Sequence, residues 1–89
     1  MKIFKYKIEV GSNEIRMPRY AKIISAGLDN NDDMCIWAIV NEEREKEKRV
    51  ILVTGTGWSI GEFKENGRGV GFIGTIRKDP YMWHVLEVF

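Results

Sequence analysis

The most informative segment of the chain is Arg49-Val-Ile-Leu-Val-Thr-Gly-Thr-Gly-Trp-Ser-Ile60. Its first half is a near-continuous run of apolar and β-branched residues, which is typical of a buried β-strand. The run ends at Gly55-Thr56-Gly57, where glycines allow a sharp turn with accessible N–H groups. Trp58 follows directly. The segment therefore predicts a strand that ends in a ligand-facing loop or, alternatively, in a tight turn with Trp58 folded back onto the core.

Alternating and apolar segments elsewhere predict further strands. Together with the first segment, the predicted strands cover residues 3–10, 21–28, 34–40, 49–56, 70–77 and 81–89. In the first of them, one face is expected to carry Phe4, Tyr6, Ile8 and Val10. Residues 14–20 alternate only briefly, through Ile15 and Met17, and Pro18 excludes pairing within the middle of a sheet.

Polar or glycine-containing segments separate these strands. Residues 11–13, 29–33 and 79–80 predict turns. The charged run 42–48 predicts a solvated hairpin tip, with one helical turn as the alternative, and 59–69 predicts a long functional loop. No helical period is evident. The pattern predicts one all-β domain over residues 1–89, closed as a small antiparallel barrel or a two-layer sandwich of about six strands.

Composition narrows the class of protein. A chain of 89 residues builds only a modest core, and such cores are often supported by oligomerisation. Cys35 is the single cysteine, which excludes an intrachain disulfide and fits a reducing cytoplasm. No segment is long and apolar enough for a membrane span or a signal peptide. A net charge of +1 gives little drive for binding long nucleic acids.

Residues for catalysis are scarce. The single histidine, His84, lies in an apolar strand, where a structural role is the usual one. Cys35 lacks a cationic setting, which favours an inert core thiol. Residues 55–57 match neither a dinucleotide fingerprint nor a P-loop. We therefore expect no catalytic set, no metal site and no cofactor.

Positive charge gathers in the first third of the chain. Residues 1–30 hold six Lys and Arg against three Asp and Glu. The cluster Arg16, Arg19 and Lys22 is either a solvated surface or a cationic lip for an anionic ligand. With the neighbouring tyrosine and the glycine turn, the predicted ligand-binding residues are Arg16, Arg19, Tyr20, Lys22, Gly55, Thr56, Gly57 and Trp58.

Several segments resemble a family of small phage proteins catalogued only as a domain of unknown function. The similar segments follow in order along nearly the whole chain: Met17-Pro18, Ala21–Ser25, Cys35–Val40, Val53–Gly57, Ile60, Phe72–Thr75 and Trp83–Val85. One departure is visible, since Trp58-Ser59 stands where the family carries a histidine and a proline. A role of that family histidine therefore does not transfer to this chain.

Small phage β domains of this kind are similar to anti-defence sponges, which sequester the cyclic nucleotides of bacterial CBASS immunity without cleaving them. The resemblance implies a dimer or tetramer that binds a cyclic dinucleotide such as cyclic GMP-AMP in the cytoplasm of the infected host. Two other functions stay open. One is a protein–protein inhibitor of a host enzyme, and the other, less favoured, is a small hydrolase that uses His84.

Overall fold

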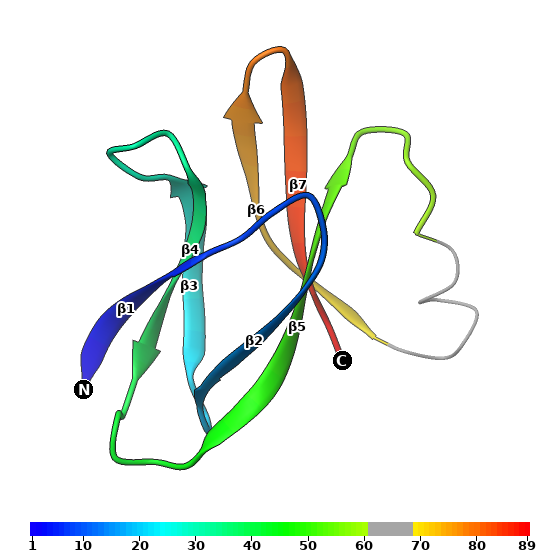
Figure 1. The fold of residues 1–89 in the computed structure, drawn as a ribbon. Helices are drawn as coiled ribbons and strands as arrows, with labels where there is room; N and C mark the ends of the chain where they lie inside the picture. The colour runs from blue at the N-terminus through cyan, green and yellow to red at the C-terminus, as the bar shows by residue number, and fades with distance from the viewer. Residues whose placement is uncertain (61–68) are drawn as a thin grey trace.

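The computed structural model describes residues 1–60 and 69–89, which form β-strands and no helix (Figure 1). The strands are β1 (Lys2–Lys7), β2 (Gly11–Pro18), β3 (Lys22–Leu28), β4 (Met34–Val40), β5 (Lys46–Gly55), β6 (Val70–Lys78) and β7 (Tyr81–Val88). They form two antiparallel sheets in the orders β1-β4-β3 and β2-β5-β7-β6. The predicted all-β fold is confirmed, and two separate sheets make it a sandwich and not a closed barrel. Within the described residues no helix could cross a membrane.

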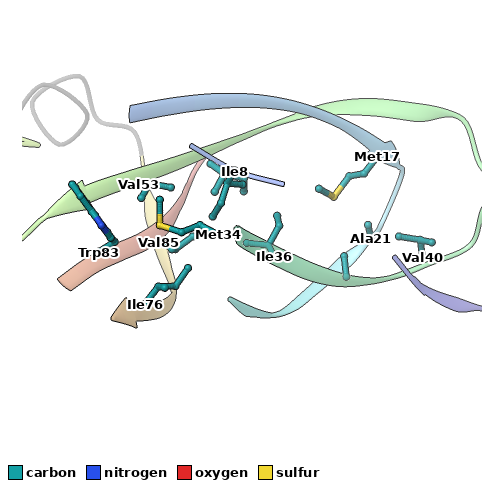
Figure 2. Packing of buried hydrophobic residues seen from close by; sticks show 12 residues of the cluster. Ile8, Met17, Ala21, Met34, Ile36, Val40, Val53, Ile76, Trp83 and Val85 are labelled. Carbon is teal, nitrogen blue, oxygen red and sulfur yellow. The ribbon is translucent and has the colours of Figure 1, made fainter. Parts of the chain in front are cut away.

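The core lies between the two sheets, because alternate residues of β4, β5 and β7 point inward. Ile36, Val40, Ile51, Val53 and Val85 are essentially inaccessible to solvent. Figure 2 shows this cluster running from Trp83 at one end of the sandwich to Met17, Ala21 and Val40 at the other. The predicted site is divided between these two ends, with the glycine turn near Trp83 and the basic residues near Met17.

The sheets also meet along one side, where edge strand β3 lies against edge strand β6. Gly74 lies at this approach, where a Cβ built on it would be in van der Waals contact with the Cβ of Ala26 at 3.4 Å. The β6–β7 register shifts between Phe72 and Gly74. This confirms the bulge or close approach expected from the glycines of this strand.

Residues 1–60 and 69–89 contain seven strands instead of about six, because the weak pattern before Pro18 is a complete edge strand. The predicted turn at residues 11–13 lies inside β2, where Gly11 has a φ of 101°. Asn13 strengthens the pairing, since its Nδ2 donates to the carbonyl oxygen of Ile51 at 3.1 Å. Pro18 is tolerated because β2 pairs on one side only, with β5.

Two further expectations need correction. Val10 is exposed and not inward-facing, because β1 ends at Lys7 and the chain turns toward β2. The last three residues of the charged run 42–48 belong to β5, so only its first part is a hairpin tip. Most of the predicted loop 59–69 lies outside the described residues.

Candidate functional site

The Gly55-Thr56-Gly57 segment forms a tight turn at the end of β5. The N–H of Trp58 donates to the carbonyl oxygen of Gly55 at 3.1 Å. Gly57 has a φ of 84°, as the third residue of a type II turn requires. The sharp turn predicted from the glycines is therefore present.

Trp58 folds back along this turn and also stays accessible. Its ring meets Trp83 edge-on, with centroids 5.3 Å apart, and Tyr81 lies 5.4 Å from Trp83 on a tilted plane. A Cβ on Gly55 would come within 2.9 Å of the Trp58 indole, so only glycine leaves room for this ring. Trp58 nevertheless remains 55% exposed. We call Trp58, Tyr81 and Trp83 the aromatic end; a cleft of about 340 Å³ lies beside Tyr81 and Trp83.

His84 lies between two threonine hydroxyls. Its Nε2 is 2.8 Å from Thr56 Oγ1, and its Nδ1 is 3.2 Å from Thr75 Oγ1. A nucleophile–base pair would normally have a third group, often a carboxylate, that orients the imidazole. Here the second ring nitrogen meets a hydroxyl, so the arrangement anchors the turn to β6 and β7.

The opposite end of the sandwich carries the basic residues. The chain turns between Pro18 and Ala21, whose N–H donates to the Pro18 carbonyl oxygen at 3.2 Å. Tyr20 occupies the third position of this turn with a left-handed φ of 65°, and it is 73% exposed. The guanidinium carbons of Arg19 and Arg44 lie 5.5 and 5.0 Å from the centre of its ring. We call Arg19, Tyr20 and Arg44 the basic corner.

Arg44 reaches this corner from the β4–β5 connection. The N–H of Arg19 donates to the carbonyl oxygen of Glu45 at 2.8 Å, which holds the two connections together. Sequence reasoning missed Arg44, because a charged run is usually a solvated surface. No local pattern placed Arg44 beside Tyr20, because their contact depends on how the two connections lie against each other.

The other two predicted cations lie near this corner. Lys22 begins β3 and is exposed, while Arg16 lies on β2 opposite Lys48. The glycine turn lies far away, because Met17 pairs with Glu47 and Trp83 pairs with Gly55, at opposite ends of β5. At a rise of 3.3 Å per residue these positions are about 26 Å apart. One chain therefore brings Arg19, Tyr20 and Lys22 together and leaves residues 55–58 separate.

Electrostatics identify a further, structural cluster on the first sheet. The Asp29 carboxylate accepts hydrogen bonds from Lys5 Nζ at 2.9 Å and from the N–H groups of Asn31 and Asp33. The Lys5 ammonium, followed by the Asp33 N–H, holds the pKa of Asp29 well below its usual range. Burial, reinforced by Asp29, raises the pKa of the Cys35 thiol. Burial and the raised pKa both favour the protonated form of the Cys35 thiol.

No group of three potential metal ligands occurs within residues 1–60 and 69–89. The chain belongs to the family described as "Domain of unknown function (DUF7352)", which it matches over residues 1–89. Neither a curated protein nor a solved structure matches the chain significantly.

Proposed function

We propose that the protein is a non-catalytic binder that sequesters a small anionic nucleotide, with a cyclic dinucleotide such as cyclic GMP-AMP as its ligand. The observation that carries the proposal is the basic corner, where one exposed tyrosine ring stands beside two guanidinium groups. A base can stack on such a ring, and stacking contributes about 1–3 kcal/mol per base. Guanidinium groups suit phosphate because their N–H donors form a planar fork.

The backbone of Tyr20 supports a role beyond packing. A left-handed φ costs an L-residue about 1–2 kcal/mol, and the same position of a turn usually holds glycine. The tyrosine ring is largely exposed, so its burial does not offset this strain. Strained residues are retained most often at binding and catalytic sites. We infer that the turn serves to present the ring.

The two arginines keep donors available for a ligand. Arg19 has one carboxylate neighbour, Glu47, at 3.8 Å from its Nε, which is longer than a hydrogen bond. Arg44 forms no salt bridge with a residue of the described ranges. An incoming phosphate would therefore not need to displace a well-formed ion pair.

The ligand's symmetry supports an oligomer. A cyclic dinucleotide has two bases and two phosphates, whereas each chain presents one basic corner. A twofold dimer would present two equivalent corners, and two dimers would form a tetramer. Acting stoichiometrically in the cytoplasm of a phage-infected bacterium, such an oligomer would lower the free signal of CBASS immunity.

The aromatic end favours a second candidate function, the inhibition of a host enzyme by direct contact. Trp58, Tyr81 and Met82 are all exposed there, and aromatic residues are common anchors of protein interfaces. In this case Trp58→Ala would abolish protection of a phage in CBASS-positive cells, whereas Tyr20→Ala would not. The reverse pattern is expected from nucleotide binding at the basic corner.

Calorimetric titration with cyclic GMP-AMP tests the first proposal. Tyr20→Ala and Arg44→Ala should each weaken binding by about tenfold, the scale of one stacked base or one charged hydrogen bond. Arg77→Ala is the matched control, because Arg77 is an exposed arginine at the aromatic end, paired with Asp79. Unchanged affinity in both corner variants would contradict the assignment.

Sequestration also predicts that the ligand survives binding. After incubation and heat denaturation, chromatography should recover the cyclic nucleotide whole, and His84→Ala should bind it as well as the parent protein. Multiple-turnover release of a linear product would instead indicate a hydrolase, with His84 as the first residue to examine.

A further inference from the structure

A second cleft, of about 340 Å³, opens beside the basic corner, where β3 of one sheet meets β6 of the other. Its lining starts at Ala21 and Lys22, directly after Tyr20. It also includes Arg49 and Glu87 from the second sheet, together with Phe72 and Phe89. We call it the β3–β6 cleft. Its volume is within the range of small-molecule sites.

Two exposed aromatic rings border the β3–β6 cleft. Phe72 on β6 is 67% exposed, and Phe89, which follows β7, is 69% exposed. Phe89 lies over Gly71, where a Cβ would come within 3.0 Å of its ring, and its N–H donates to the Gly69 carbonyl oxygen. The glycines thus let this ring lie close to β6. Exposed rings at a cleft suit stacking with a flat ligand.

The guanidinium group of Arg49 supplies hydrogen-bond donors to the lining of the cleft. The Nε and Nη2 of Arg49 donate to the Glu87 carboxylate, and its Nη1 donates to the Ala21 carbonyl oxygen at 2.9 Å. A guanidinium has five N–H donors, so two form no hydrogen bond with a described residue, and the nearest other carboxylate oxygen, Glu47 Oε1, is 3.9 Å from Nη1. Because Glu87 compensates the charge of Arg49, these donors suit the acceptor edge of a base better than a phosphate.

A separate cation lies at the lip of the cleft. Lys22 is exposed and forms no salt bridge within the described part of the chain. Its ammonium group can therefore bind a negatively charged group of a ligand whose ring lies deeper, beside Phe72 and Phe89. The basic corner begins two residues earlier along the chain.

We infer that the β3–β6 cleft is the subsite for a guanine base, with its phosphate at Lys22 and the basic corner. Guanine presents two adjacent acceptors, O6 and N7, and arginine is their usual partner. Adenine presents an amino donor in place of O6, which would face another donor. The inference rests on the proposed function for its ligand class, and it adds the place and identity of one base.

Amide NMR titrations with GMP, AMP, guanosine and inorganic phosphate test the assignment. GMP should shift the amides of Lys22, Ile23, Phe72 and Phe89 and bind about tenfold or more tightly than AMP. Phe72→Ala should weaken GMP binding by about tenfold, the scale of one stacking interaction. Tyr81→Ala is the matched control, because this exposed ring lies at the aromatic end.

The charge at the lip is tested in the same way. Lys22→Ala should weaken GMP but leave guanosine unchanged, whereas Lys7→Ala, an exposed lysine on β1, should alter neither. Phe72→Ala and Tyr81→Ala should keep the parent amide spectrum outside the altered site, because the truncated rings are largely exposed. Equal affinity for GMP and AMP, or shifts confined to other residues, would overturn the assignment.

Two outcomes separate this inference from the proposed function. If cyclic GMP-AMP binding depends on Tyr20 and Arg44 but is indifferent to Phe72→Ala and Lys22→Ala, the cleft assignment is wrong and the proposed function stands. If GMP binds in the cleft while no cyclic dinucleotide binds at all, the cleft assignment stands and the proposed function is wrong.

Discussion

Replacing Glu87 by glutamine removes the negative member of a buried ion pair between β5 and β7 of the second sheet. Glu87 accepts two hydrogen bonds from Arg49, whose third bond reaches the Ala21 carbonyl oxygen at the start of the first sheet's edge strand. The side chains of Arg49 and Glu87 are only 16% and 9% exposed. Glu87→Gln keeps the shape of the side chain but leaves the guanidinium with Glu47 as its remaining carboxylate neighbour, whose Oε1 lies 3.9 Å from Nη1.

The expected cost follows from this burial. Removing one partner of a buried ion pair costs about 3–5 kcal/mol, because the remaining charge stays desolvated and uncompensated. Arg49 keeps some access to water, its bond to Ala21 and the more distant Glu47 carboxylate, so we expect about 3 kcal/mol, the lower end of that range. For a domain of this size that loss lowers the melting temperature by about 12–24 °C. A typical domain of 89 residues has a total stability of only about 4–13 kcal/mol.

Urea unfolding followed by tryptophan fluorescence measures the effect, since Trp83 lies in the core. The control is the double variant Arg49→Met/Glu87→Leu, which replaces the pair with apolar groups and should stay within about 1 kcal/mol of the parent protein. A loss below about 1 kcal/mol for Glu87→Gln would show that the pair is effectively solvated. If the double variant lost as much unfolding free energy as Arg49→Met and Glu87→Leu lose separately, added together, the coupling between the two residues would be refuted.

Three further predictions concern other parts of the fold. Because Lys5 lowers the pKa of Asp29, the stability that this carboxylate contributes is complete above about pH 4 and is lost as the pH falls further. The midpoint of urea unfolding should therefore fall less steeply below pH 4 in Asp29→Asn than in the parent protein. An unchanged slope would argue against this pair. Gly57→Ala should destabilise the protein by about 1 kcal/mol, because φ is 84° there, and an unchanged melting temperature would contradict the strain. Cys35 is buried with a raised pKa, so at pH 8 a thiol reagent should label it far more slowly in native than in urea-unfolded protein; equal rates would show that the thiol is accessible.

The sequence alone was sufficient for the fold class and for most strands. Apolar runs and alternation with period two are local properties of the sequence, so β4, β5 and β7 were predictable without knowledge of their neighbours. The tight turn after β5 was likewise predictable, because Gly57 supplies a φ that other residues rarely adopt. The edge strand β2 was missed in part, because its pattern is weak and its stability comes from pairing with β5.

The composition of the site was partly predictable, but its arrangement was not. Arg19 and Tyr20 stood out in the basic third of the chain, whereas Arg44 joined them only through contact between two chain connections. The Arg49–Glu87 pair joins residues 38 positions apart. The glycine turn and the basic residues looked like one site in the sequence and lie at opposite ends of β5. Local patterns determined which residues form strands, while strand order and register, which depend on long-range pairing, decided which side chains meet.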